Sequence, residues 1–172
     1  FYLKVNEDDI PGVLSKVSVM KILLLGGTGM LGSEFKTILE DSDHGLLAPS
    51  RAELDVLDNA MLLQFVELYA PDLIINCVAY TAVDLAETDR EAAYLLNAKA
   101  VENLVQTKVP LIHFSTDYVF DYDLETGDIP ENYVRKAVNY YGATKLEGER
   151  VLDTSNIPFW NIRTSWLFGP GG

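Results

Sequence analysis

The 172-residue sequence has little cysteine, histidine or positive charge. Cys77 is its single cysteine, which excludes an internal disulfide and predicts a reducing compartment, the cytoplasm. The two histidines, His44 and His113, stand apart in the sequence and predict no metal site. Lysine and arginine number 13 against 26 acidic residues, a formal net charge of −13. Because such a surface repels phosphate backbones, no nucleic-acid partner is expected.

Long apolar runs are also missing. No stretch approaches the roughly 20 residues of a membrane span, and no basic segment followed by an apolar one opens the chain. We therefore expect neither a membrane protein nor a signal peptide. With 48% hydrophobic and 23% charged residues, the composition is that of an ordinary globular protein of about one domain.

Short apolar runs alternate with helical patterns from residue 20 onward. Strands are expected at 21–25, 46–48, 73–78, 111–115 and 159–163, and helices at 31–39, 58–69, 86–107 and 138–153. This alternation predicts an α/β fold, a doubly wound parallel sheet forming a Rossmann-like NAD(P)-binding domain. Ligands on such sheets bind beyond the carboxyl ends of the strands, where segments 26–32, 76–81 and 115–120 fall.

Residues 1–19 precede this pattern, and Met20 is expected to be the natural start of the domain. The stretch resembles the opening strand and turn of an ACT regulatory domain, but far too few residues match to define that domain. We therefore expect an N-terminal extension of unknown role, followed by the nucleotide-binding domain at 20–172.

A glycine-rich turn directly follows the first expected strand and opens a helix. Gly26, Gly29 and Gly32 allow a tight turn, close approach of the backbone to a pyrophosphate, and close packing of helix on strand. The helix N-terminus adds free N–H groups and a partial positive charge. This setting favours dinucleotide binding over a turn that is merely tight. The expected cofactor contacts in this turn are Gly26, Thr28, Gly29, Met30, Leu31 and Gly32.

The end of the second expected strand indicates which cofactor binds. An acidic residue there ordinarily contacts the ribose 2′-OH of NAD, but the sequence has Ala-Pro-Ser-Arg at 48–51. Ser50 and Arg51 could accept a 2′-phosphate, so NADPH is favoured and NADH is the alternative. Arg51 could equally be a solvated loop residue, and Asp55 could lie beside the adenine.

A candidate catalytic pair lies on the last expected helix, where Tyr141 and Lys145 share one face. A neighbouring ammonium lowers the pKa of a phenol, so the pair could exchange a proton with a carbonyl while hydride moves to or from a nicotinamide. The same spacing also fits an exposed helix pair, but the order of elements favours catalysis. Thr116 could position the substrate carbonyl, with Ser115 as a close competitor.

These segments together resemble the dTDP-4-dehydrorhamnose reductase family, among the extended short-chain dehydrogenases/reductases. The resemblance covers about residues 20–170. Besides the glycine-rich turn, it rests on Glu-Leu-Asp-Val-Leu-Asp (53–58), Asn-Cys-Val-Ala-Tyr-Thr-Ala-Val-Asp (76–84), Ser-Thr-Asp-Tyr-Val-Phe (115–120), Tyr-Gly-Ala-Thr-Lys-Leu-Glu-Gly-Glu (141–149) and Arg-Thr-Ser-Trp (163–166). The strings at 115–120 and 163–166 are the most specific to that family.

The resemblance implies a role for individual residues. Tyr141 would protonate a 4-keto oxygen, while Lys145 would hold the nicotinamide ribose and depress the pKa of Tyr141. Gly29, Met30 and Leu31 would lie on the pyrophosphate, Asp55 and Val56 beside the adenine, Ala79, Tyr80 and Thr81 along the cofactor, Thr116 and Asp117 at the sugar, and Trp166 at the sugar nucleotide.

The resemblance also implies an activity, the NADPH-dependent reduction of dTDP-4-dehydro-L-rhamnose to dTDP-L-rhamnose in nucleotide-sugar biosynthesis. Family members continue well beyond this length, so most of the substrate-binding region is expected to be absent. A homodimer is an open alternative to a monomer. The alternative function is a non-catalytic, NADP-binding regulatory subunit like that of methionine adenosyltransferase, which is similar to this family.

Overall fold

A computed structural model of the chain describes residues 18–121 and 129–169. Nearly all of the expected N-terminal extension at 1–19, and part of the polar loop that follows the fourth strand, lie outside these residues. Among the helices that are described, none is both long and apolar enough to cross a bilayer.

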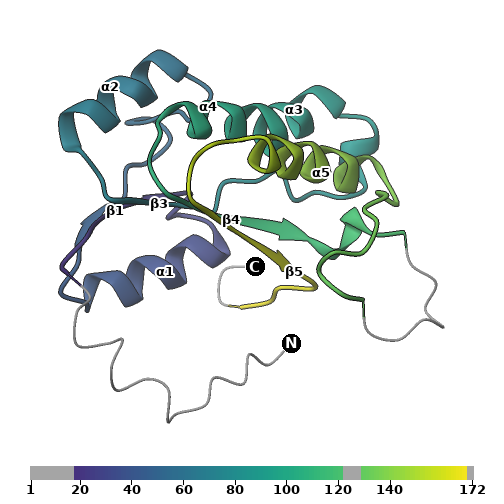
Figure 1. The fold of residues 1–172 in the computed structure, drawn as a ribbon, viewed down its shortest axis with the longest axis horizontal. Helices are drawn as coiled ribbons and strands as arrows, with labels where there is room; N and C mark the ends of the chain where they lie inside the picture. The colour runs from purple at the N-terminus through teal and green to yellow at the C-terminus, as the bar shows by residue number, and fades with distance from the viewer. Residues whose placement is uncertain (1–17, 122–128, 170–172) are drawn as a thin grey trace, which may run out of the picture.

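Five parallel strands form one sheet in the order β2-β1-β3-β4-β5 (Figure 1). The strands are β1 (Lys21–Leu25), β2 (Gly45–Leu47), β3 (Leu73–Asn76), β4 (Leu111–Thr116) and β5 (Phe159–Thr164). In the centre, Leu23 of β1 pairs with Leu47 of β2 on one side and with Ile74 of β3 on the other. The predicted parallel α/β sheet is confirmed, and all five strands lie within two residues of their expected bounds.

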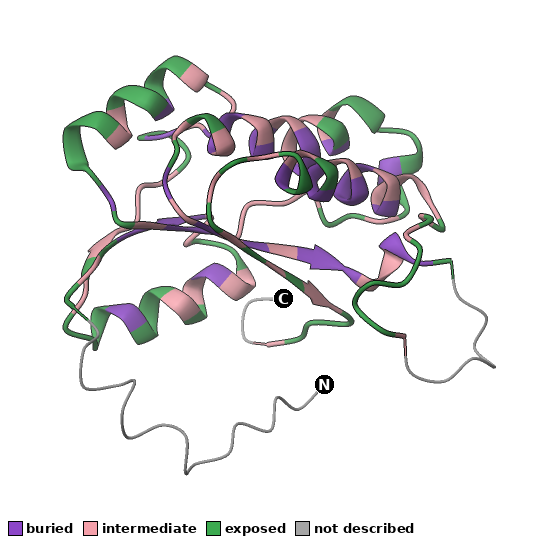
Figure 2. Ribbon diagram, in the orientation of Figure 1, coloured by how far each residue is buried: buried purple, intermediate pink, exposed green. Residues whose placement is uncertain are grey.

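Helices cover the two faces of this sheet unequally (Figures 1 and 2). One face carries α2 (Asn59–Tyr69), α3 (Arg90–Tyr94), α4 (Ala100–Gln106) and α5 (Tyr140–Asp153), and the other carries α1 (Met30–Glu40). The larger core lies under the helix-rich face and includes Leu23, Ile74, Val101, Leu104 and Leu152, all fully buried. The smaller core packs Leu39 of α1 against Ile22, Leu24 and Ile75.

Local signals in the sequence set two of the helix ends. Asp58 caps α2, as predicted, and its carboxylate accepts a hydrogen bond from the Met61 backbone N–H at 3.0 Å. The helix ends at Ala70, which has a left-handed backbone with φ of 45°, directly before Pro71. Asn139 caps α5, so this helix starts two residues later than the expected 138.

The expected continuous helix at 86–107 is wrong in detail. The structure divides it into a 3-10 turn η3 (Leu85–Glu87), α3, a π-helical segment η4 (Leu95–Lys99) and α4. The π-helical turn allows the buried Asn97 to bond across to two other elements instead of remaining on a regular helix face. Apolar periodicity does not reveal such a change of helix type.

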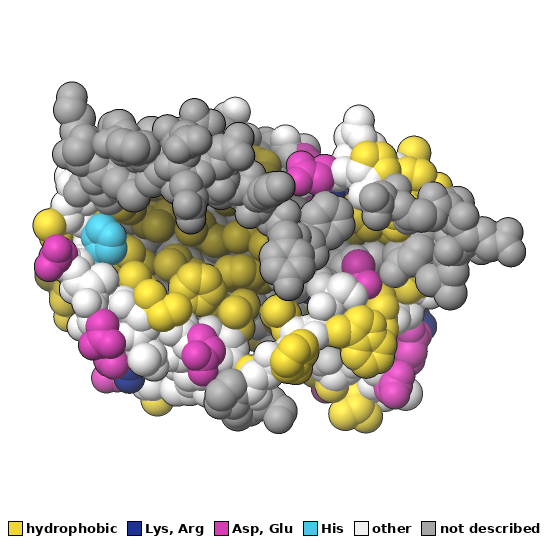
Figure 3. Space-filling model, turned by 90° about the horizontal axis from the view of Figure 1, so that it is seen from below, with side chains coloured by type: hydrophobic (Ala, Val, Ile, Leu, Met, Phe, Trp, Pro, Cys, Tyr) yellow, Lys and Arg dark blue, Asp and Glu magenta, His cyan; other side chains and the backbone are white. Residues whose placement is uncertain are grey.

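Within residues 18–121 and 129–169, no helix covers the β5 end of the sheet face that carries α1. Ile112 and Phe114 of β4 pair with Trp160 and Ile162 of β5, so these side chains share that face. Trp160 is 57% exposed and Ile162 is 41% exposed. Figure 3 shows hydrophobic side chains gathered on this side of the molecule.

Candidate active site

The strand order places a crevice at the carboxyl ends of β1 and β3. The chain passes from β1 outward to β2 and then returns to β3 on the other side, which makes this the switch point where open parallel sheets bind ligands. The glycine-rich turn follows β1, and residues 77–81 follow β3. The Cys77 N–H donates to the Leu25 carbonyl at 3.0 Å and holds the two loops together.

Two glycines in the first of these loops are required by close backbone contacts. Gly26 has a φ of 76°, and a Cβ there would lie 2.8 Å from the Cys77 carbonyl carbon. A Cβ on Gly32 would lie 2.0 Å from the Gly26 carbonyl oxygen. The turn closes through a hydrogen bond from Gly29 N–H to the same oxygen at 3.0 Å.

The start of α1 presents backbone N–H groups to the crevice. Gly29 precedes the helix, and no side chain caps it. Met30 and Leu31, whose N–H groups belong to the first turn, line the adjoining cleft. Uncapped N–H groups at a helix N-terminus attract phosphate, so the turn fits a cofactor pyrophosphate.

The cleft at this end of the sheet has a volume of about 520 Å³. It brings together predicted residues from five segments of the chain: Gly29, Met30, Leu31, Ala79, Thr81, Thr116, Tyr141, Lys145 and Trp166. Asn76, Cys77, Val78, Phe114, Ser115, Thr164 and Leu167 complete its lining. The glycine-rich turn and the tyrosine–lysine pair therefore line the same cleft, although they lie more than a hundred residues apart in the sequence.

Lys145 projects from α5 into the cleft and is almost fully buried. Its Nζ donates to the Phe114 carbonyl oxygen at 2.5 Å. Burial lowers the pKa of Lys145 to about 8, and the nearby Glu149 charge opposes that shift. The ammonium is thus held at a fixed place but is only moderately stable as a cation.

Tyr141 lies against Tyr118, with the ring centroids 6.0 Å apart and edge-on. Burial raises the pKa of Tyr141 above its ordinary value, and hydrogen bonding to Thr116 only partly opposes this. Lys145, whose Nζ is bonded to the Phe114 carbonyl, is not among the groups that shift this pKa here, so its expected lowering of the pKa of Tyr141 remains a prediction. Tyr141 is therefore a protonated phenol near neutral pH, which suits a proton donor.

The two candidate hydroxyls at the end of β4 have different surroundings. Thr116 bonds to Tyr141 and donates from Oγ1 to Asp117 Oδ1 at 3.1 Å. The Asp117 Oδ2 atom accepts a hydrogen bond from Ser165 Oγ at 2.7 Å. The Ser115 hydroxyl is buried on the side of Glu149, whose pKa it helps to lower, and not beside Tyr141. This geometry favours Thr116 over Ser115 as the hydroxyl that acts beside Tyr141.

Trp166 follows directly after this cluster and is 84% exposed, with a left-handed φ of 50°. Its ring contributes to the mouth of the cleft, next to Leu167. A large aromatic ring held open to solvent at the edge of a cleft is suited to stack on a planar ligand group.

The residues expected around the adenosine do not line this cleft. Arg51 Nε lies 3.4 Å from Asp55 Oδ2, and the Arg51 side chain is 76% exposed. The Ser50 N–H and Oγ both donate to Glu53 Oε2 at 2.8 Å. Val56 is buried in the larger core, and its carbonyl accepts a hydrogen bond from Asn103 Nδ2 at 3.0 Å. The proposed 2′-phosphate contacts of Ser50 and Arg51 remain a prediction.

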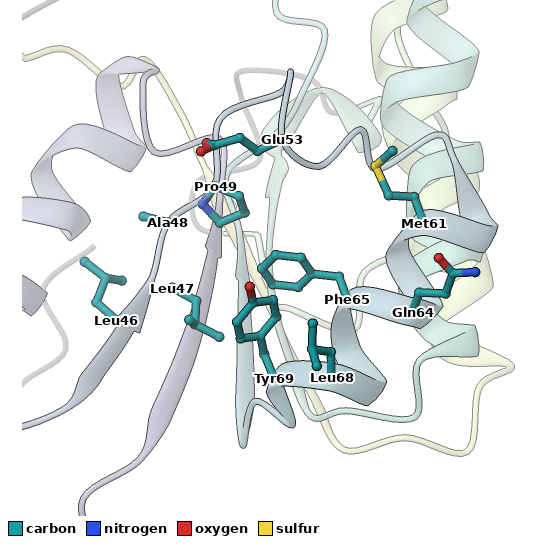
Figure 4. Close-up of a pocket in the computed structure, with 10 residues that line it drawn as sticks. All are labelled: Leu46, Leu47, Ala48, Pro49, Glu53, Met61, Gln64, Phe65, Leu68 and Tyr69. Atoms are coloured by element: carbon teal, nitrogen blue, oxygen red, sulfur yellow. The ribbon is translucent and has the colours of Figure 1, made fainter.

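A second hollow lies between β2 and α2 (Figure 4). It is lined by Leu46, Leu47, Ala48, Pro49, Glu53, Met61, Gln64, Phe65, Leu68 and Tyr69, and none of these is a predicted site residue. Glu53 is the single charged side chain in this lining. Without a paired acid and base or a cluster of donors, this hollow offers no chemistry comparable to the cleft.

Sequence reasoning missed Asn97, which joins the two halves of the cleft. Asn97 Oδ1 accepts from the Tyr80 N–H at 2.9 Å, and Nδ2 donates to the Tyr80 carbonyl at 3.1 Å and to Thr144 Oγ1 at 3.0 Å. It thereby fixes the loop after β3 against the helix that carries Tyr141 and Lys145. Its partners are distant in the sequence, so no local pattern reveals this role.

Fold and site together define a Rossmann-like nucleotide-binding protein with a tyrosine–lysine pair at its ligand crevice. The chain belongs to the family described as RmlD substrate binding domain, whose profile matches residues 20–172. It is 35% identical over 157 residues to dTDP-4-dehydrorhamnose reductase of Aggregatibacter actinomycetemcomitans, covering 88% of this chain and 53% of that protein. The Salmonella typhimurium reductase is 36% identical, with 89% and 53% covered.

A solved structure agrees with these relatives. The dTDP-4-dehydrorhamnose reductase of Bacillus anthracis, crystallised in complex with NADP, superposes with a TM-score of 0.80 at 31% identity. The match covers 90% of this chain and 56% of that one. The chain therefore spans about half the length of the relatives it matches. Their names favour a reductase over the alternative of a regulatory subunit.

Proposed function

We propose that residues 20–172 form the cofactor-binding and catalytic part of an NADPH-dependent sugar-nucleotide reductase. Its reaction is the reduction of the 4-keto group of dTDP-4-dehydro-L-rhamnose to dTDP-L-rhamnose. The observation that carries the proposal is the single cleft that joins the start of α1 to Tyr141, Lys145 and Thr116. The single cysteine supports action in the cytoplasm, and the low pI supports the absence of a nucleic-acid partner. A homodimer is proposed as the assembly.

The cleft fits a dinucleotide. The Gly26–Gly32 turn is packed so closely that a Cβ on Gly26 or on Gly32 would clash with backbone atoms. The N–H groups of Met30 and Leu31 lie at a helix start that no side chain caps. These residues would hold the pyrophosphate, and Lys145 would hold the nicotinamide ribose. When bound, NADPH supplies the hydride for the carbonyl carbon.

The protein supplies the proton. Tyr141 is protonated near neutral pH because burial raises its pKa, so its hydroxyl can donate a proton to the 4-keto oxygen as negative charge develops there. Thr116, hydrogen-bonded to Tyr141, would orient the same oxygen. The Lys145 ammonium would stabilise the phenolate that forms.

The proposed activity is tested by mixing the chain with NADPH and dTDP-4-dehydro-L-rhamnose and following the loss of NADPH absorbance. We expect NADPH consumption that depends on the keto-sugar. NADPH titration by protein fluorescence, run separately, measures cofactor binding alone. Cofactor binding without turnover would reduce the proposal to a cofactor-binding module, and absence of both would refute it.

The cofactor preference is tested by Arg51→Gln. Because Arg51 is mostly solvent-exposed, we expect the NADPH dissociation constant to rise roughly three- to tenfold, with that of NADH changed less than about twofold. Arg150→Gln is the matched control, since it removes an exposed arginine from α5. Equal effects of Arg51→Gln on the two cofactors would mean that Arg51 does not contact the 2′-phosphate.

A further inference from the structure

A buried charge cluster lies directly behind the proposed catalytic lysine. Glu149, one turn after Lys145 on α5, is fully buried. Arg163 of β5 donates from Nε to Glu149 Oε1 and from Nη2 to Oε2, both at 2.8 Å. Arg135 donates from Nη1 to Glu149 Oε2 at 2.8 Å and also pairs with Asp153. The Glu149 carboxylate is therefore bound from two sides by guanidinium groups.

The cluster joins three separate segments of the chain. Arg135 comes from the segment before α5, Glu149 from α5 and Arg163 from β5. Arg163 also donates from Nη1 to the Glu131 carbonyl at 2.9 Å and lies 4.9 Å from the Phe120 ring centroid. Arg163 is the first residue of the Arg-Thr-Ser-Trp string, and its hydrogen bonds go to Glu149 and to the Glu131 carbonyl, not to the catalytic pair. These contacts give it a structural role.

The guanidinium groups keep the buried carboxylate ionised. Burial raises the pKa of Glu149, but hydrogen bonding, chiefly from Arg163 and Arg135 and to a smaller extent from Ser115 and Asn161, outweighs it and brings the pKa to about 2. A fully buried anion thus lies one helical turn from Lys145, where residues four apart have Cβ atoms about 5–6 Å from each other.

Few other charges act on Lys145. Its own Nζ is bonded to a neutral backbone oxygen, that of Phe114. His113 of β4 is buried, bonds through Nδ1 to Asn76, and has its pKa brought well below the ordinary value by burial and by the Lys145 charge, so it is neutral. Asp117 acts on Tyr141, on the other side of the pair. Among the described residues, the Glu149 carboxylate is the anion that opposes the desolvation of Lys145.

We propose that Glu149, fixed by Arg135 and Arg163, is a positioning residue that holds Lys145 in its cationic form at the cleft. Glu149 does not reach the cleft itself, and it acts through space along one turn of α5. The inference rests on the proposed function only for the reason that a charged Lys145 is useful at the cleft. The charge state of Lys145 itself can be measured without cofactor, substrate or turnover.

The test is a titration of Lys145 by NMR, using the Cε signals of isotope-labelled lysine in the whole chain. The Lys145 signal is identified by its loss in Lys145→Arg. In Glu149→Gln we expect the pKa of Lys145 to fall by about one unit or more, a tenfold or larger fall in its charged-to-neutral ratio. Glu147→Gln, which removes an exposed carboxylate from the same helix, leaves the titration unchanged.

A second pair of variants separates charge from folding. Arg135→Met removes one cation from the cluster at a partly exposed position, so the pKa of Lys145 rises. Glu149→Asp keeps the charge, so the titration stays near that of the natural chain even where thermal stability falls. If Glu149→Gln does not fold, Arg135→Met decides alone. An unchanged pKa of Lys145 in Arg135→Met, or in folded Glu149→Gln, would overturn the proposal.

Discussion

Replacing Tyr141 by phenylalanine is expected to lower kcat/KM for keto-sugar reduction by about 10²- to 10⁴-fold, the range for loss of a general acid. In the proposed mechanism the Tyr141 hydroxyl is the proton source, and Thr116, its hydrogen-bond partner, cannot replace it because an aliphatic hydroxyl is a far weaker acid than a phenol. Cofactor binding is expected to weaken less than about tenfold, since one neutral hydrogen bond contributes about 0.5–1.5 kcal/mol. Steady-state kinetics and NADPH titration measure the two effects separately.

The neighbouring Tyr140→Phe is the matched control for this variant. Tyr140 also lies in the first turn of α5, but its ring packs 4.7 Å from the Arg90 guanidinium and outside the cleft lining. Its kcat/KM is expected to equal that of the natural chain. If Tyr141→Phe kept more than about a tenth of the activity, another group would be the acid.

Adding a single methyl group at Gly32 is expected to disrupt the cofactor turn. The Cβ of alanine there would lie 2.0 Å from the Gly26 carbonyl oxygen and 2.9 Å from Gly27 Cα, and both atoms are backbone atoms that cannot rotate away. We expect Gly32→Ala to lower the free energy of unfolding by about 1–3 kcal/mol, or more, as overpacking does. NADPH affinity is expected to fall at least about tenfold, because the first turn of α1 is displaced from the pyrophosphate.

Two other glycines serve as controls for Gly32→Ala. At Gly45, the first residue of β2, the nearest atom to an added Cβ is 3.8 Å away, so Gly45→Ala keeps both stability and affinity. At Gly29 the distance is 3.5 Å, so Gly29→Ala keeps the fold. Urea unfolding and NADPH titration of the three variants give the comparison. If Gly32→Ala matched Gly45→Ala in both, the close packing of the turn would not matter for the cofactor.

Local sequence signals predicted the elements that depend on local chemistry. The apolar runs gave the strands within two residues, and Asp58 and Pro71 marked the ends of α2. The glycine-rich turn and the pair on α5 were predicted to meet because parallel strands end at one edge of the sheet. The π-helical segment around Asn97 was not predicted, since its cause is a set of bonds to Tyr80 and Thr144.

The electrostatics of the site were less predictable than its composition. The pKa of Tyr141 depends on how far the ring is buried, and a four-residue spacing contains no information about burial. The Arg135–Glu149–Arg163 cluster brings together a segment, a helix and a strand that meet only in the folded chain. Of these three residues, Glu149 and Arg163 entered the sequence analysis only as members of the strings 141–149 and 163–166, and Arg135 did not enter it at all.

The place of β1 inside an all-parallel sheet, between β2 and the central strand β3, has a consequence for how the chain folds during synthesis. All neighbouring strands are parallel, as in the pairs of Ile22 with Leu73 and of Leu111 with Phe159. Because parallel strands need a long crossover connection, no two neighbouring strands are joined by a short hairpin. At roughly 5–20 residues per second on a ribosome, β1 waits several seconds for β3 to emerge. During that interval its apolar residues lack their central partner, so the nascent chain passes through a stage in which capture by a chaperone competes with self-association.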